Sequence, residues 1–496
     1  MGQGLGVRLV GLSALSNRFP RPFEMAFVLT LFYLMVAYLS TKTVFGAMAV
    51  YHVEEILLLV VFCVSVPALT RAFVQRTIQT LALGGLAIAV ALSMIIGKGY
   101  AHGALHEFSG FIPNALAYFL VTLHCRTKLR LQMLVLLLFF VVSFVIVNGT
   151  IELQTITPFQ YFHPQSDDDD LSFKDADPDI QVDTATADLY LMPQVGTEGV
   201  IWRLKGQNFI GDPNDFGQLL VCLLPLTFIF WRPKRLALNI AIVLPMVSMI
   251  GFGMYLTHSR GALLSVMGVV IVAFRRRIGT IPSVVLGGGL FAAAMALHAT
   301  GGRDISAESG ADRTALWGEG LGLLKLHPIF GAGFNQMADI IGKTAHNSVI
   351  VCAAELGFFG LFCWSLFLLP TVRDAMAVAS PTGLTDGMPM PVDDSPYAYI
   401  VPSTEKLDKA EIGAMGRLIF FSLVGFLISA MFLSRAFVMT FFLLGGMAEV
   451  VFQMALDRGM IAPRLPYGKA TLYSGILSLL LVPGMYIIVR ILNLGH

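Results

Sequence analysis

Two arginines and one histidine stand where apolar segments meet polar ones, and their chemistry suits a phosphate-bearing substrate. Arg260 lies in a turn between two apolar runs, Arg313 lies in a long polar segment, and His346 precedes another apolar run. A guanidinium group binds phosphate oxygens through paired hydrogen bonds. Near pH 7, a neutral histidine can take a proton from a hydroxyl group. We therefore expect these residues to bind an anion and to activate an acceptor hydroxyl.

The depth of Arg260 in a membrane follows from the length of the apolar run after it. If that run covered only residues 261–274, it would extend about 21 Å, which is too short for a hydrocarbon core of about 30 Å. The segment from His258 to Arg260 is therefore expected at or below the outer interface. An arginine at that depth needs an acid, a carbonyl or a lipid phosphate as its partner. Alternatively, its side chain simply extends to the interface.

Arg313 lies near the start of a predicted amphipathic helix on the outer leaflet. Ser309 with Asp312 resembles a capping box. The apolar residues that follow recur at helical spacing: Leu316, Trp317, Leu321 and Leu324. An arginine in a first helical turn opposes the helix dipole, so helix stability does not explain Arg313. It contacts an anion, or it is a surface arginine whose charged end reaches water.

His346 has no obvious carboxylate partner on its own helix. Glu355 follows nine residues later, which is a rotation of about 900° and a rise of about 13.5 Å. Glu355 therefore points away from His346, and we expect it to make a buried polar contact with another helix. An alternative function for His346 is that of a helix cap or an interface residue.

Further candidates for binding a phosphate-bearing or acidic substrate surround these residues. Arg203 and Lys205 precede the sixth apolar run, and Ser259 and Asn347 adjoin Arg260 and His346. Between the two groups, Asp212-Pro213 predicts a helix N-cap followed by proline at the first helical position.

The elements that position these residues are predicted to be membrane helices. The 496-residue chain is 56% hydrophobic and only 13% charged, with a mean hydropathy of +0.74. Runs of about 20 apolar residues predict an all-α polytopic membrane protein of about twelve to thirteen spans. The ranges are 24–42, 53–69, 77–97, 111–125, 131–148, 216–231, 236–257, 259–275, 281–299, 347–371, 416–433, 436–455 and 471–490. The five cysteines lack metal or redox spacing.

Basic residues indicate the orientation of the chain. They cluster in alternate short loops, which predicts that those loops and the N-terminus are cytoplasmic. The clusters are Arg71/Arg76, Arg126/Lys128/Arg130, Arg232/Lys234/Arg235, Arg275–Arg277 and Arg458/Arg464/Lys469. The opposing short loops carry about one basic residue each: Lys42, Lys98, Arg260 and Arg435. The long loops 149–215 and 300–346 then lie on the outer, non-cytoplasmic side of the membrane. The net charge of +1 suggests no nucleic-acid partner.

The predicted domain organisation separates five segments. Residues 1–148 are N-terminal transmembrane helices, 149–215 an acidic outer loop, 216–372 the core that includes loop 300–346, 373–415 a cytoplasmic linker, and 416–496 the last helices. The run Asp167–Asp170 is interpreted as part of a solvated insertion, with calcium binding as the alternative. Neither this loop nor the linker is expected to contribute to catalysis.

The spacing around His346 resembles the signature of the O-antigen ligase and O-antigen polymerase superfamily. That signature is histidine, then asparagine, serine or glutamine, then nine residues and two glycines three apart; here these are His346, Asn347, Gly357 and Gly360. Other elements in residues 200–370 occur in a similar order: the Ser259-Arg260-Gly261 turn, the Arg313 helix, His327-Pro328, Gly331 and Gly333. A departure is Trp317, four residues after Arg313, where leucine is common.

The resemblance implies an inverting GT-C-like glycosyltransferase of the bacterial inner membrane that uses no metal, cofactor or nucleotide sugar. Its donor would be a glycan linked to undecaprenyl pyrophosphate, and its acceptor another glycan, a lipid A core or a protein. By this resemblance Arg260 and Arg313 hold the pyrophosphate, and His346 acts on the acceptor hydroxyl. The alternative functions are a non-enzymatic transporter or flippase of lipid-linked sugar and a structural scaffold. The oligomeric state does not follow from the sequence.

Overall fold

The computed structural model describes residues 22–46, 52–75, 77–155, 190–196, 199–297, 299–300, 307–380 and 407–493. Within these ranges the chain is an all-α polytopic membrane protein. Eight of its helices are long and apolar enough to cross a membrane, and two further apolar helices are shorter. The predicted fold class is confirmed. A helix suits hydrocarbon because it satisfies its backbone hydrogen bonds within one segment.

The predicted spans fall on helices along the whole described chain. The N-terminal part contains α2 (Pro22–Leu39), α3 (Thr41–Phe45), α4 (Val53–Gln75), α5 (Ile78–Leu92), α6 (Ala101–His124) and α7 (Lys128–Thr155). The remainder contains α9 (Pro213–Leu226), α10 (Leu236–Thr257), α11 (Arg260–Ile278), α12 (Thr280–Ala296), α13 (Ala307–Leu326), α14 (Met337–Ile341), α15 (Ser348–Ala379), α16 (Lys409–Ala430), α17 (Met439–Leu456) and α18 (Tyr467–Asn493). Membrane crossing by α2, α4, α6, α11 and α12 stays a prediction.

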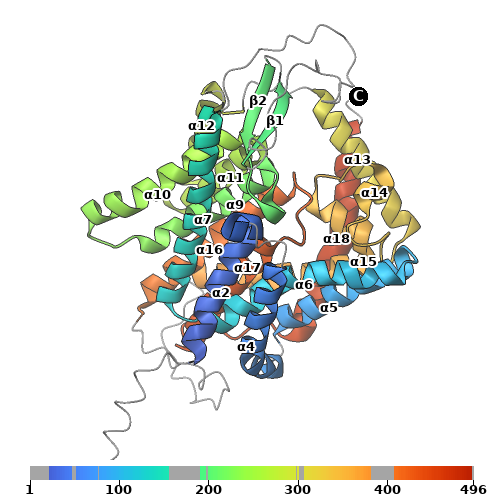
Figure 1. The fold of residues 1–496 in the computed structure, drawn as a ribbon, viewed down its shortest axis with the longest axis horizontal. Coiled ribbons are helices and arrows are strands. Elements are labelled where there is room, and N and C mark those ends of the chain that lie inside the picture. Colours follow the sequence, from blue (N-terminus) through green and yellow to red (C-terminus); the bar gives the residue numbers. More distant parts are fainter. Residues whose placement is uncertain are drawn as a thin grey trace, which may run out of the picture.

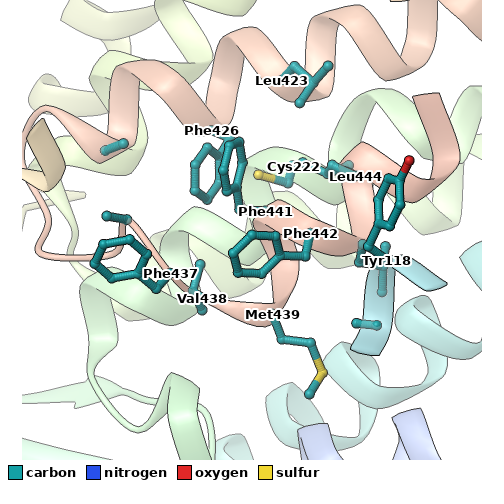
Figure 2. Packing of buried hydrophobic residues seen from close by; sticks show 14 of the residues in the cluster. Tyr118, Cys222, Leu423, Phe426, Phe437, Val438, Met439, Phe441, Phe442 and Leu444 are labelled. Atoms are coloured by element: carbon teal, nitrogen blue, oxygen red, sulfur yellow. The ribbon is translucent and has the colours of Figure 1, made fainter. Parts of the chain in front are cut away.

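Helix α15 is the centre of the bundle and packs against α5, α16, α17 and α18. Pairs of aromatic rings join α15, α16 and α17 to one another. Phe426 of α16 stacks on Phe441 of α17 with 5.0 Å between ring centroids, and Figure 2 shows the two rings face to face. Phe367 of α15 meets Phe441 and Phe442 edge-on at 5.1 and 5.3 Å. Such offset and edge-on pairs add to the stability gained from burial, and they hold together the helices that carry the turn around His346.

A break in α15 explains why its sequence pattern needs glycine. Gly357 has φ +65°, and a Cβ atom there would lie 2.4 Å from the carbonyl oxygen of Ile329. The break lets the segment before α14 pair with the helix backbone. Phe358 N donates to Pro328 O at 2.8 Å, and Ala332 N donates to Ala354 O at 2.9 Å. The first glycine of the signature therefore leaves room for the backbone of residues 328–333 to pack against α15.

A two-stranded hairpin lies in the loop that we expected to be a solvated insertion. Strands β1 (Leu191–Gly196) and β2 (Gly199–Leu204) are antiparallel, with Met192 opposite Arg203. Leu204 is fully buried, and a Cβ on Gly149 would contact its side chain, so this end of the loop packs on α7. In Figure 1 the hairpin stands at the same end of the molecule as one end of α13. Asp167–Asp170 lie outside the described residues.

Helix α13 begins earlier than predicted. It starts at Ala307, which places Ser309 inside the helix instead of at its N-cap. The residues before Ser309 are helix formers and extend the first turn. Arg313 therefore lies in the second turn, where the helix dipole acts only weakly. The predicted apolar face is present, because Trp317, Leu321 and Leu324 are buried.

Candidate active site

His346 occupies a strained turn directly before the cap of α15. Its backbone has φ +47°, a left-handed conformation that is uncommon for a residue with a side chain. The backbone N–H of His346 donates to Ser434 Oγ at 2.9 Å. The next residue, Asn347, is fully buried, and its Oδ1 accepts from Val349 N and Ile350 N at 3.0 and 3.2 Å. These contacts hold the partly buried His346 side chain at the helix start.

A second set of contacts joins this turn to the segment before α17 and to α9. Ser348 Oγ donates to Leu433 O at 2.6 Å and accepts from Arg435 N at 3.0 Å. The guanidinium of Arg435 forms an ion pair with the buried carboxylate of Asp215. Three segments far apart in the sequence therefore meet beside His346.

The turn that carries Arg260 rests on a buried polar network. Arg203 is 4% exposed, and its Nη2 donates to Asn214 Oδ1 at 2.9 Å. Ser259 Oγ donates to the same oxygen at 2.9 Å. Ser259 is also the N-cap of α11, and Arg260 is its first residue. The network holds Ser259 in place and so positions the backbone of Arg260 at the start of α11.

The charge of Arg260 acts on Arg313, and the charge of Arg313 acts on His346. Partial burial lowers the pKa of Arg313, and the positive charge of Arg260 lowers it further, although the guanidinium stays charged. Burial and then Arg313 lower the pKa of His346 from its ordinary value. Two cations that act on each other, one of which also acts on an imidazole, form an arrangement that can bind an anion near a proton acceptor.

Residues 216–365 match the family model described as O-antigen ligase. The segment belongs to the O-antigen ligase/polymerase superfamily. The match supports a relation of this segment to ligases and polymerases of surface polysaccharides. No curated protein matches the chain.

Three charged residues that we did not assign to the site act on His346, and two of them, Asp212 and Arg435, lie outside the matched segment. Arg435 and Lys343 also lower the pKa of His346, whereas Asp212 raises it. Asp212 is the predicted N-cap of α9, which is confirmed because its side chain accepts from Asn214 N at 2.7 Å and Pro213 follows it. The sequence signal for Arg435 was its place as a lone basic residue in a short outer loop.

The four predicted substrate-binding residues differ in how many protein contacts they make. They are Arg203, Lys205, Ser259 and Asn347. Arg203 also donates through Nε to Thr257 O at 2.9 Å and through Nη1 to Gln194 Oε1 at 2.7 Å. Ser259 and Asn347 are almost fully buried and cap helices. Lys205 is half-buried. The geometry gives Arg203, Ser259 and Asn347 structural contacts, and substrate binding by all four residues stays a prediction.

Glu355 serves α14 and not His346. Its carboxylate accepts from Met337 N at 3.3 Å, at the start of α14, and the residue is buried. The prediction that Glu355 makes a buried polar contact with another helix is confirmed, and its direction relative to His346 stays a prediction. Among the residues that the structure describes, no three His, Cys, Asp or Glu side chains gather as metal ligands.

Proposed function

We propose that the protein transfers a glycan from an undecaprenyl-diphosphate carrier to an acceptor hydroxyl at the outer face of a bacterial inner membrane. The observation that carries this proposal is the hydrogen bond from Trp317, one helical turn after Arg313, to the carbonyl of Ala345, which directly precedes His346. The charges of Arg260 on Arg313 and of Arg313 on His346 support it, and all three residues lie in the segment that matches the O-antigen ligase model. The two arginines hold the diphosphate. His346 acts on the acceptor, which is a growing glycan, a lipid A core or a protein.

The arrangement supports a direct displacement at the anomeric carbon. The acceptor oxygen bonds to this carbon as the bond to the diphosphate oxygen breaks, and His346 takes the acceptor's proton. Arg260 and Arg313 offset the charge that develops on the departing lipid diphosphate. The lowered pKa of His346 keeps its imidazole neutral at pH 7, so it can accept this proton.

The ends of α15 support a location on one face of the membrane. At the far end from His346, Asp374 and Glu449 share Arg464, whose Nη1 lies 2.8 Å from Glu449 Oε2 and 3.9 Å from Asp374 Oδ2. Asp374 is 26 residues after Ser348, which is at most about 39 Å along the two helical parts of α15. Arg464 belongs to a basic cluster that is predicted to be cytoplasmic, so this second charged layer supports an outer location for His346.

The proposal is tested by glycan transfer in membranes that carry His346→Ala, Arg260→Ala or Arg313→Ala at matched protein levels. Each variant is expected to lose transfer by at least about a hundredfold, the usual scale for a general base or a charge-stabilising group. Lys42→Ala, an exposed cation of α3, is the control and is expected to transfer normally. Undiminished transfer in all three site variants would overturn the assignment and favour a non-enzymatic carrier of lipid-linked sugar.

A further inference from the structure

We propose that Arg435 is a third arginine that binds the diphosphate of the glycan donor, and that Asp215 holds its guanidinium in place for this contact. The inference rests on the proposed function. Both residues lie outside the matched segment 216–365, so the family match assigns them nothing.

The backbone around Arg435 places it in the site independently of its side chain. Arg435 N donates to Ser348 Oγ at 3.0 Å, and Ser434 Oγ accepts from His346 N at 2.9 Å. Residues 434 and 435 therefore run alongside residues 346–348. The side chain of Arg435 therefore starts one residue after Ser434, which contacts the candidate base His346.

Among the described residues, the side chain of Arg435 is paired through one nitrogen, and about a third of it is exposed. Its Nη2 pairs with Asp215 Oδ2. The Asp215 side chain is 4% exposed, whereas that of Arg435 is 36% exposed. A guanidinium has five N–H donors in a rigid fork, so one anchored nitrogen leaves donors for a phosphate oxygen. The buried carboxylate fixes the fork, and its exposed part stays available to a ligand.

Another arginine of the same region shows what a purely structural guanidinium looks like here. Arg203 is 4% exposed, and its Nε, Nη1 and Nη2 all donate to protein oxygens. Arg435 has the opposite character, with one ion pair and an exposed remainder. The contrast favours ligand binding for Arg435 over a contribution to packing alone.

The charge around His346 also favours an anion in contact with Arg435. Among the described residues, Arg313, Arg435 and Lys343 act on His346 as positive charges and Asp212 acts as a negative charge, while Asp215 pairs with Arg435. Asp215 offsets part of the charge of Arg435, which keeps this guanidinium beside the other cations at a smaller repulsive cost. The phosphates of the donor would complete the balance.

The test measures binding of undecaprenyl diphosphate to the full-length protein in detergent, with undecaprenol as the uncharged comparison. Arg435→Gln keeps the backbone bond to Ser348 and removes the guanidinium. It is expected to weaken diphosphate binding, and to raise the donor KM, by about tenfold, as expected for one charge-assisted hydrogen bond. Undecaprenol binding is expected to stay unchanged. Arg435→Lys should recover part of the loss, and Lys42→Gln should bind as the wild type does.

Two further variants separate binding from positioning. Asp215→Asn keeps the guanidinium but weakens its anchor, and it is expected to raise the donor KM less than Arg435→Gln does. Ser434→Ala removes the hydroxyl that accepts from His346 N, and it is expected to lower kcat with little change in the donor KM. Because Arg435→Gln leaves a buried carboxylate unpaired, the double variant Asp215→Asn/Arg435→Gln provides a folded comparison and should show the same donor KM as Arg435→Gln.

The outcomes distinguish this inference from the proposed function. If Arg260→Gln and Arg313→Gln weaken diphosphate binding but Arg435→Gln and the double variant do not, the assignment of Arg435 is wrong and the proposed site stands. If none of these arginine variants changes diphosphate binding, the proposed function fails, and the assignment of Arg435 fails with it.

Discussion

Trp317 donates a hydrogen bond from its indole Nε1 to the carbonyl oxygen of Ala345, at 2.8 Å. Arg313 lies one helical turn before Trp317, and His346 directly follows Ala345. A single bond therefore links the helix that carries a candidate phosphate-binding arginine to the turn that carries the candidate base. The tryptophan that departs from the family's usual leucine thus has a structural task that leucine cannot perform.

Trp317→Phe tests whether this bond positions the site. Phenylalanine retains an aromatic ring but has no N–H donor, so the buried carbonyl of Ala345 loses its partner at a cost of about 1–3 kcal/mol. We expect kcat to fall about tenfold, with a smaller change in donor affinity. Kinetics of the purified variant check this. Trp231→Phe, at a tryptophan that is 48% exposed, serves as the control. Unchanged kcat in Trp317→Phe would separate this bond from catalysis.

The second prediction concerns stability and follows from the break in α15. Alanine at residue 357 would need φ +65°, and its Cβ would lie 2.4 Å from Ile329 O. Strain of this kind costs about 1–3 kcal/mol before the backbone clash is added. Gly357→Ala is therefore expected to lower the midpoint of thermal unfolding and to abolish transfer, because the 328–333 segment can no longer pair with α15.

Gly84→Ala is the matched control for that variant. Gly84 lies inside α5 with no atom within 4 Å of the added Cβ, and alanine is the better helix former. It is expected to leave unfolding unchanged or to raise its midpoint. Equal unfolding midpoints for Gly357→Ala and the wild type would contradict the proposed reason for the first signature glycine.

The helices could be predicted from the sequence because their signals are local, and the candidate site residues were proposed from local patterns of the same kind. Apolar runs of spanning length predicted the helices, and the spacing after His346 indicated the turn before α15. The ion pair of Arg435 with Asp215 joins residues 220 positions apart, and no periodicity announces it. In the sequence, Arg203 looked like a cation available to a substrate. Its burial against Thr257, Gln194 and Asn214 depends on the packing of β1, β2, α9 and α10, which local sequence patterns do not reveal.

The acid limb of the pH–rate profile makes a third prediction. Burial, Arg313, Arg435 and Lys343 lower the pKa of His346, and Asp212 raises it. A base works only when neutral, so transfer should persist below the ordinary histidine pKa of about 6.5 and fall as His346 is protonated at lower pH. The wild-type profile of kcat/KM against pH checks this.

Two variants should move this limb in opposite directions. Asp212→Asn removes a negative charge that favours the imidazolium, so the pKa of His346 falls further and the limb shifts to lower pH; asparagine still caps α9. Lys343→Gln removes a positive charge, so the pKa rises and the limb shifts to higher pH. Lys343 is exposed, so the protein fold should not change. A limb that stays fixed in both variants would show that a group other than His346 accepts the proton.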